Sequence, residues 1–346
     1  MSRTTRRQRD DRVNLSSNEL LSARAVEVHR KAVLGFAPED LVRYPVMAEP
    51  AERVAEHLGL SPDEVVLTPG SDTALRLLCQ HYVRGGGDLL LTQAPNYAAW
   101  EQTAATLGLR VEEVTAPLAD PVAQGAALLE RASATTGALI AVSAPNGLSG
   151  GCVGDAVLDG LAELARERRH LLVIDACYQA FHGPLTARLA RRGGPVVVVQ
   201  SMSKSHGLAG ARVAVLAGEP ALVAALGAAP LENAVSATAI AVLLNALDHD
   251  AEFRAIWAET CRTREAAQER LAGWGWAPLR SRANFVTTPL PAGLASGDVV
   301  AGLSAAGYRV KDLHGLPGLA DCIRFTVGDA GVVDPFLDAL AGVAGG

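Results

Sequence analysis

The sequence is poor in aromatic residues and carries no excess of positive charge. Aromatic side chains make up only 4% of the 346 residues, so aliphatic side chains must fill most of any core. The formal net charge of -6 offers no basic field, and we therefore expect no nucleic-acid partner. The hydrophobic fraction of 49% is large enough to bury a substantial core, which excludes global disorder.

Cysteine is scarce and scattered, and no motif is built from it. None of the five cysteines has the spacing of metal ligands, and their number is odd. We therefore expect reduced thiols, no metal site and a cytoplasmic protein. The five residues are Cys79, Cys152, Cys177, Cys261 and Cys322.

Long hydrophobic runs are also missing. The longest, Ala234–Leu247, is interrupted by polar residues and is too short to span a bilayer, so we expect a buried helix there. Five arginines stand within the first dozen residues, but no apolar run follows them, which argues against a secretory signal. The sequence therefore predicts no membrane partner.

Short aliphatic runs alternate with helix-like stretches along most of the chain. Helices such as Thr73–Val83 and Ala156–Arg168 lie between these runs. This alternation is typical of an α/β fold in which helices flank a mostly parallel sheet on both faces. We expect one central sheet of seven strands, at Val65–Thr68, Leu89–Thr92, Val111–Val114, Leu139–Val142, Leu171–Asp175, Val196–Gln200 and Val213–Leu216.

The pattern changes after about residue 248. A long helix over Glu252–Leu271 is followed by shorter elements of both kinds, which indicates a smaller α+β domain. We expect a large domain over residues 41–247, the small domain over 248–346, and a segment over residues 1–40 that packs on the small domain. The shorter elements are strands at Asn284–Thr287, Tyr308–Val310 and Cys322–Val327 and helices at Asp298–Ala306 and Val332–Val343.

The strongest chemical signal is a lysine directly after an expected strand. Lys204 follows the run Val196–Gln200, and α/β folds bind ligands at the carboxyl ends of their strands. Lysine forms Schiff bases with carbonyl cofactors. Ser201, Ser203 and Arg212 offer hydroxyl and guanidinium donors that suit a phosphate dianion. Taken alone, Lys204 is more simply interpreted as an exposed loop lysine. The polar residues at two other strand ends argue against that interpretation.

Two other strand ends carry polar residues. Asp175 ends a buried run, where a carboxylate needs a cationic partner such as a protonated pyridine nitrogen; the alternative is a helix cap. After Val65–Thr68, the turn through Gly70, Ser71 and Asp72 enters a helix, and helix N-termini bind anions. Taken alone, such a turn also suits an ordinary helix cap.

In their order and spacing, these segments resemble the fold-type I pyridoxal-phosphate-dependent aminotransferases, most of all the histidinol-phosphate aminotransferase-like enzymes. The resemblance extends from about Asn14 to Gly328. It implies pyridoxal 5'-phosphate as the cofactor, with Lys204 as the Schiff-base lysine and Asp175 on the pyridine nitrogen. It also implies an amino acid and a 2-oxo acid as the substrates.

The resemblance assigns roles to further residues. Ser71, Asp72, Ser201, Ser203 and Arg212 match the residues around the cofactor phosphate. Tyr97 matches the aromatic residue that stacks on the ring, and Tyr178 matches the tyrosine that hydrogen-bonds the phenolate oxygen, with Asn146 beside it. Tyr44 matches a tyrosine that reaches the partner subunit's phosphate, which implies a homodimer. The expected substrate-binding residues are Arg324, Lys311 and Glu19.

The chain departs from the family pattern at three places. Gly147 stands where relatives have an asparagine that donates to the phenolate oxygen, so either Asn146 shifts to serve or Tyr178 acts alone. Lys311 replaces an arginine, and a lysine cannot bind an anion bidentately. Leu20 and Leu21 follow Glu19 where relatives have other residues and then an aromatic one.

Together these features predict an aminotransferase that works by ping-pong chemistry, plausibly in specialised amino-acid biosynthesis. The departures lead us to expect that histidinol phosphate is not its preferred substrate. The alternatives are another pyridoxal-phosphate reaction on an amino acid (decarboxylation, elimination or oxidation), a histidine-pathway histidinol-phosphate aminotransferase, or a regulator or scaffold without catalysis.

Overall fold

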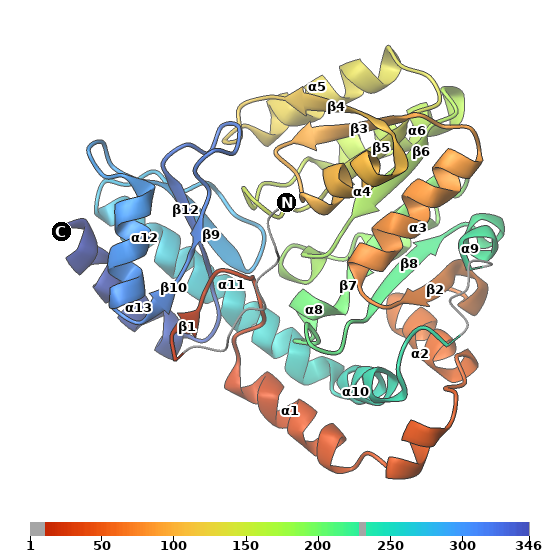
Figure 1. Ribbon diagram of the computed structural model, residues 1–346, viewed down its shortest axis with the longest axis horizontal. Helices are drawn as coiled ribbons and strands as arrows, with labels where there is room; N and C mark the ends of the chain where they lie inside the picture. Colours follow the sequence, from red (N-terminus) through yellow and green to blue (C-terminus); the bar gives the residue numbers. More distant parts are fainter. Residues whose placement is uncertain (1–10, 228–232, 346) are drawn as a thin grey trace.

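A computed structural model describes residues 11–227 and 233–345. Within these ranges the expected seven-stranded sheet is confirmed, with the strand order β2-β8-β7-β6-β5-β3-β4 (Figure 1). Six of the seven strands run in the same direction and only β8 runs in the opposite one, so the sheet is mostly parallel. The strands are β2 (Val65–Thr68), β3 (Leu89–Ala94), β4 (Arg110–Thr115), β5 (Leu139–Ser143), β6 (Leu171–Asp175), β7 (Val196–Ser201) and β8 (Ala214–Gly218).

Helices cover both faces of the sheet, as the alternation predicted. Successive residues of a strand point to opposite faces, so Leu172 and Ile174 join one core cluster while Leu171 and Val173 join another. The first cluster packs against α5 (Pro121–Ser133), α6 (Asp155–Glu167) and α7 (Thr186–Ala190). The second packs against α3 (Ser71–Arg84), α4 (Ala99–Leu107) and α9 (Pro220–Gly227).

A third cluster covers the β2–β8 end of the sheet. It joins these strands to α2 (Ala48–Leu58) and to α10 (Ala237–Asp248). The expected buried helix over Ala234–Leu247 is therefore present as α10. The expected strand Val213–Leu216 lies slightly later, because the ladder with β2 begins at the Thr68–Ala214 pair.

The chain after α10 forms a separate layer beside the sheet, at the left of Figure 1. The long helix α11 (Asp250–Gly273), α12 (Ser296–Ala305) and α13 (Ala330–Ala344) pack on an antiparallel sheet of order β11-β12-β9. The expected run Tyr308–Val310 is divided, because Val310 turns into the core between two short strands. The strands are β9 (Phe285–Pro289), β10 (Tyr308–Arg309), β11 (Lys311–Asp312) and β12 (Cys322–Thr326).

The N-terminal segment contacts both parts of the chain. Its strand β1 (Val13–Asn14) pairs with β10, and its helix α1 (Ala23–Leu34) packs along α10 and α11. The segment therefore contacts elements that lie before residue 248 in the sequence as well as elements that lie after it. The short elements are η1 (Pro38–Val42), η2 (Pro62–Glu64), η3 (Gln179–Phe181) and α8 (Met202–Ser205). Among the described residues, no helix combines the length and hydrophobicity that a membrane crossing requires.

Candidate active site at the carboxyl edge of the large sheet

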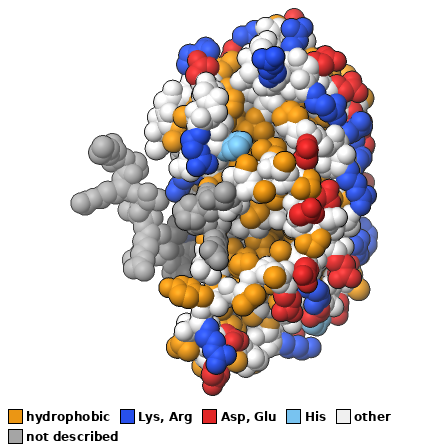
Figure 2. Space-filling model, turned by 90° about the vertical axis from the view of Figure 1, so that its right-hand side faces the viewer, with side chains coloured by type: hydrophobic (Ala, Val, Ile, Leu, Met, Phe, Trp, Pro, Cys, Tyr) orange, Lys and Arg blue, Asp and Glu red, His pale blue; other side chains and the backbone are white. Residues whose placement is uncertain are grey.

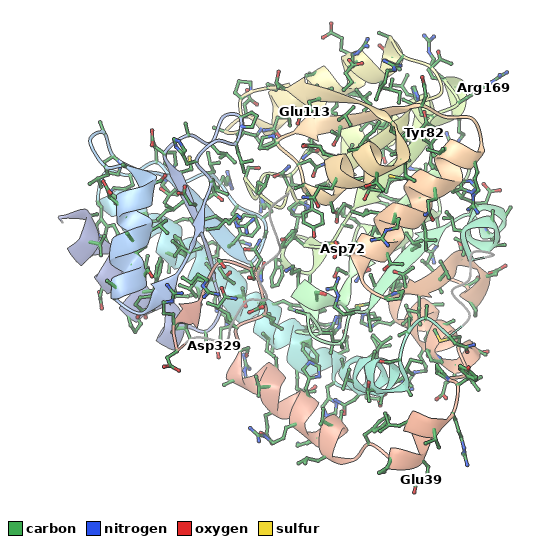
Figure 3. The ribbon with its side chains drawn as sticks, viewed as in Figure 1. Glu39, Asp72, Tyr82, Glu113, Arg169 and Asp329 are labelled. Atoms are coloured by element: carbon green, nitrogen blue, oxygen red, sulfur yellow. The ribbon has the colours of Figure 1, made fainter. Side chains whose placement is uncertain are left out.

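The expected cofactor residues come from three strand ends at one edge of the large sheet. Strands β2, β6 and β7 run in the same direction, because β2 and β7 are both antiparallel to β8 and β6 is parallel to β7. Their carboxyl ends lead into Gly70, Asp175 and α8, which carries Lys204. Figure 3 shows Asp72 near the middle of the molecule, between the sheet and the C-terminal layer.

Lys204 is the cationic centre of this edge. Its Nζ donates a hydrogen bond to the carbonyl of Ser17, at 2.7 Å. Burial lowers the pKa of Lys204 to about 8, with neighbouring charges as smaller causes. A substantial fraction of the amine is therefore neutral near physiological pH, which is the form that attacks a carbonyl carbon.

Asp175 is a buried carboxylate whose negative charge has no positively charged partner among the described residues. Its Oδ1 accepts a hydrogen bond from the amide of Cys177, at 3.1 Å. In the part of the chain that the structure describes, no ion pair is formed by Asp175, and burial raises the pKa of its carboxyl above the ordinary value. A cation supplied from outside the chain would remove that cost, so Asp175 fits the ring nitrogen of the cofactor.

A turn before α3 and an arginine after α8 form an anion cradle. Gly70 has a φ of 80°, and a Cβ there would lie 2.6 Å from Nη2 of Arg212, so this position requires glycine. Arg212 donates to Asp72 at 2.9 Å, and Tyr97 donates to the other oxygen of Asp72 at 2.8 Å. Ser71, the first residue of α3, places its backbone N–H at the helix N-terminus beside this pair.

The α8 turn adds a hydroxyl that has no partner. Ser201 caps α8, and its Oγ accepts a hydrogen bond from the amide of Ser203 at 3.2 Å. The Oγ of Ser203 is buried and makes no hydrogen bond within the described residues. A buried hydroxyl without a partner is costly, and a phosphate oxygen would satisfy it. The cradle thus fits the phosphate of pyridoxal phosphate.

The contacts of Asn146 show whether it replaces, beside Tyr178, the asparagine that relatives have at position 147. Asn146 does not shift toward the tyrosine, because its Nδ2 donates to the carbonyl of Pro95 and its Oδ1 accepts from the amides of Leu148 and Ser149. These bonds hold the loop after β5. A Cβ at Gly147 would lie 3.6 Å from the hydroxyl of Tyr178, so glycine leaves that side of the phenol without an amide.

Asn18, from the N-terminal segment, supplies the amide instead. Its Nδ2 donates to the hydroxyl of Tyr178 at 2.9 Å, and its side chain is almost fully buried. Asn18 has a left-handed φ of 54°, a conformation that asparagine tolerates better than most residues. Its backbone is fixed by bonds with Thr326 and Asn284. Asn18 was not among the site residues predicted from the sequence, although it lies beside Glu19 in the segment that resembles the family.

Arg324 is the second cation at the site. It lies on β12, and its guanidinium donates to the carbonyls of Gly147, at 2.5 Å, and Ser16, at 3.0 Å. The guanidinium carbon also lies over the ring of Phe285, 5.1 Å from the ring centroid. Burial lowers the pKa of Arg324, and among the described residues it has no carboxylate partner. An anionic substrate group would provide the missing negative charge.

Two of the expected substrate residues lie near these cations. Lys311 is directly opposite Arg324 in the β11–β12 ladder and is exposed to solvent. Glu19 accepts a hydrogen bond from Asn14 at 3.3 Å, and its charge raises the pKa of Lys204. Leu20 is buried against the α1 and α11 helices, and Leu21 packs against the C-terminal core. The two leucines therefore do not line the site.

Tyr44 stands apart from the other expected residues. Its side chain is 84% exposed, and no hydrogen bond within the described residues links it to the site of its own chain. It lies in an apolar segment whose large side chains are also exposed, namely Leu41, Val42 and Val46.

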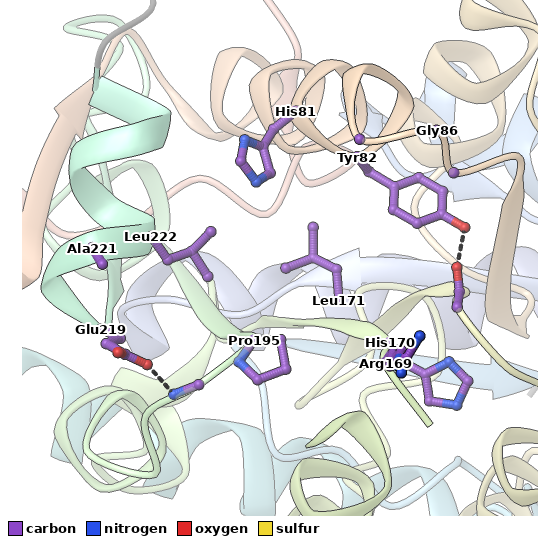
Figure 4. A pocket seen from close by; sticks show the side chains of 14 residues that line it. His81, Tyr82, Gly86, Arg169, His170, Leu171, Pro195, Glu219, Ala221 and Leu222 are labelled. Atoms are coloured by element: carbon purple, nitrogen blue, oxygen red, sulfur yellow. Dashed lines mark hydrogen bonds between the residues drawn. The ribbon is translucent and has the colours of Figure 1, made fainter. Parts of the chain in front are cut away.

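A second concavity is not part of this site. A pocket of about 600 Å³ opens beside α3 and α9 (Figure 4), and it includes Leu171 and Pro195. Leu171 begins β6 and Pro195 immediately precedes β7, so the pocket lies at the opposite edge of the sheet from Lys204.

A buried lysine, an unpaired buried carboxylate and an anion cradle at the carboxyl edge of an α/β sheet define an enzyme that uses a phosphorylated carbonyl cofactor. Comparison with known proteins agrees with this class. The family described as aminotransferase class I and II matches residues 10–340. The chain belongs to this family, which confirms the predictions of a fold-type I aminotransferase and of pyridoxal phosphate as its cofactor.

The relatives are similar over most of their length. The histidinol-phosphate aminotransferase of Methylibium petroleiphilum is 33% identical over 297 residues, which cover 84% of this chain and 77% of the relative. That of Symbiobacterium thermophilum is 32% identical over 345 residues, which cover 97% and 91%. The crystal structure of histidinol-phosphate aminotransferase from Sinorhizobium meliloti in complex with pyridoxal-5'-phosphate has a TM-score of 0.83 at 22% identity, covering 97% and 91%.

Proposed function

We propose that the chain transfers an amino group between an amino acid and a 2-oxo acid, with Lys204 as the covalent attachment point of the cofactor. The observation that carries this proposal is that Asp175 ends β6 and Lys204 directly follows β7, so that both lie at the carboxyl ends of two adjacent parallel strands. When bound, pyridoxal phosphate supplies an electron sink for the Cα carbanion. Family membership supports amino transfer over decarboxylation, elimination or oxidation.

The residues of the chain then have distinct roles. Asp175 keeps a proton on the ring nitrogen through its negative charge, and Arg212, Ser201, Ser203 and the α3 N-terminus around Ser71 hold the phosphate. Asp72 fixes Arg212 and Tyr97, so that the guanidinium and the phenol ring are oriented before the cofactor arrives. These assignments agree with the roles that the family resemblance implies.

The proton transfers fall to two side chains. Once the substrate amine had replaced it on the cofactor, Lys204 would be free to take the proton from Cα, because its lowered pKa keeps the amine available near neutral pH. Tyr178 donates its hydroxyl hydrogen to the phenolate oxygen, and the Asn18 amide polarises that hydroxyl from the other side. Arg324 clamps the substrate's anionic group and thereby fixes which Cα bond reacts.

Replacing Asp175 by asparagine should separate charge from shape. Asp175→Asn retains the size of the side chain but cannot stabilise a proton on the ring nitrogen. Without that proton the ring would be a weaker electron sink, so we expect the half-reaction to slow by at least ~100-fold, about 2.7 kcal/mol of transition-state stabilisation. Stopped-flow absorbance with one amino donor measures this. The change Asp298→Asn, at an exposed position of α12, is the control, and near-normal turnover of Asp175→Asn would refute the assignment.

Removing the Asn18 amide should change the cofactor spectrum. Asn18→Gly deletes the donor and keeps the left-handed backbone, so Tyr178 becomes a weaker donor and the pH at which the visible absorption of the loaded enzyme changes should rise. Adding Gly147→Asn to the same chain should lower that pH again, because it restores an amide beside Tyr178. A titration midpoint that is identical in all of these variants and the parent enzyme would show that Asn18 is only structural.

We also propose a homodimer with shared sites, working in the cytoplasm. Tyr44 and its exposed apolar neighbours Leu41, Val42 and Val46 support an interface, because large apolar side chains rarely gather on the surface of a monomer. Figure 2 shows hydrophobic side chains across the middle of the face that carries α3 and α9. All five cysteines are free thiols, which supports a reducing compartment.

Mixing two defective variants tests whether Tyr44 acts across the interface. Tyr44→Phe chains lose the hydroxyl, and Lys204→Ala chains lose the attachment point. A mixed dimer contains one site with Lys204 from one chain and Tyr44 from the other, so activity per intact Lys204 should rise on mixing. Sedimentation velocity should show a dimer throughout. No gain on mixing, or an active monomer at working concentration, would contradict the proposal.

We propose that the preferred amino donor is not histidinol phosphate, although the curated relatives carry that name. The support is Lys311, which lies opposite Arg324 and offers a point charge instead of a second planar guanidinium group. We expect an amino acid with another side chain, in specialised amino-acid biosynthesis. The departure from the family pattern after Glu19 gives no such support, because Leu20 and Leu21 are packed into cores.

A substrate panel tests this proposal directly. Values of kcat/KM should be measured for histidinol phosphate and for a set of amino acids, each with 2-oxoglutarate as the acceptor. We expect at least one amino acid to exceed histidinol phosphate. A tenfold advantage of histidinol phosphate, about 1.4 kcal/mol of transition-state preference, would make the chain a histidine-pathway enzyme instead. Lys311→Arg is the matched variant and should shift the ratio toward histidinol phosphate.

A further inference from the structure

Three metal-ligating side chains meet behind the turn that carries Lys204. His57 comes from α2, His206 directly follows α8, and Asp250 begins α11. One ligand atom of each lies within 4.8 Å of those of the other two. The three residues are far apart in the sequence and form no spacing motif, so the sequence alone does not reveal this cluster.

The ligand atoms of this cluster are poorly satisfied by hydrogen bonds. Nε2 of His206 and Oδ1 of Asp250 are buried, and neither has a hydrogen-bond partner within the described residues. The His206 side chain is fully buried, at 0% exposure. Buried polar atoms without partners are rare in folded proteins, and an unrecorded ion is one of their ordinary explanations.

The spacing suits a metal better than a direct bond. Nδ1 of His57 and Oδ1 of Asp250 are 3.7 Å apart, which is too long for a hydrogen bond. A tetrahedron built on bonds of about 2.1 Å has an edge of about 3.4 Å, so these two atoms stand close to coordination distance. The ligand atom of His206 lies within 4.8 Å of the other two, so it has to move closer when the ion binds.

His206 and Asp250 each make a hydrogen bond through the side-chain atom that does not face the cluster. Nδ1 of His206 shares a hydrogen bond with the hydroxyl of Ser205, at 2.8 Å, which leaves Nε2 facing the cluster. Oδ2 of Asp250 accepts from Arg254 at 2.5 Å, which leaves Oδ1 for the cluster. Outer contacts of this kind fix ring and carboxylate orientation at metal sites. The charge of Arg254 opposes a cation and limits its affinity.

We propose that His57, His206 and Asp250 bind one Zn²⁺ ion, with solvent in the fourth position. Two imidazoles and one carboxylate favour Zn²⁺ and its transition-metal neighbours over Ca²⁺ and Mg²⁺, which prefer oxygen ligands. The Asp250 side chain is 29% exposed and gives the ion a path to the cluster. The ion ties α2 and α11 to the residue that follows α8, and thus stabilises the turn of Lys204 from behind.

Metal binding to the untagged, cofactor-loaded enzyme tests the site. After chelator treatment and dialysis, isothermal titration should show one Zn²⁺ per chain, and Zn²⁺ should raise the melting temperature. Co²⁺ in place of Zn²⁺ should give the visible absorption bands of a tetrahedral site with nitrogen and oxygen ligands. His57→Ala and Asp250→Asn, at the two partly exposed ligands, should each lose the binding, the temperature shift and the Co²⁺ bands.

His81→Ala removes a partly buried histidine of α3 outside the cluster and is the matched control, which should bind as the parent does. Circular dichroism of the two ligand variants, without metal, shows whether they fold. The proposal is overturned if the parent enzyme binds no stoichiometric Zn²⁺. It is equally overturned if folded His57→Ala and Asp250→Asn bind like the parent, because the ion then lies elsewhere, for example at the cofactor phosphate. Neither outcome depends on which substrate the enzyme uses.

Discussion

The uncompensated carboxylate of Asp175 is the constraint around which the site is built. A buried carboxylate without a cation is costly, and the sheet places this one at the end of β6, covered by helices on both faces. Burial raises the pKa of Asp175, and it lowers the pKa values of two cations at the same edge, Lys204 and Arg324. The chain therefore holds charges of both signs at this edge, largely out of contact with water. A charged cofactor and an anionic substrate would compensate them on binding.

Closure of this edge depends on the N-terminal segment. The carbonyls of Ser16 and Ser17 accept hydrogen bonds from Arg324 and Lys204, and Asn18 donates to Tyr178. One short segment thus contacts Arg324, Lys204 and Tyr178, three of the groups to which the proposed chemistry assigns roles. Because β1 pairs with β10 and α1 packs on α10 and α11, that segment is held from both sides of residue 248.

Much of the fold and the main site residues could be predicted from the sequence. Seven aliphatic runs alternate with helices, and a buried parallel strand needs such a continuous run, so β2 and β6 were predicted with their observed bounds. Lys204 and Asp175 could be found because each follows or ends a strand. Asn18 could not, because its contact with Tyr178 joins positions 160 residues apart and depends on a left-handed backbone that the sequence does not reveal.

The exchange at Gly147 shows how a missing side chain is compensated in space rather than in sequence. An amide at position 147 would approach Tyr178 from the loop after β5, and that loop is already held by Asn146. Asn18 approaches the same hydroxyl from the N-terminal segment, so the phenol keeps one amide donor. Gly147 keeps its carbonyl bonded to Arg324, which ties the loop to the substrate side.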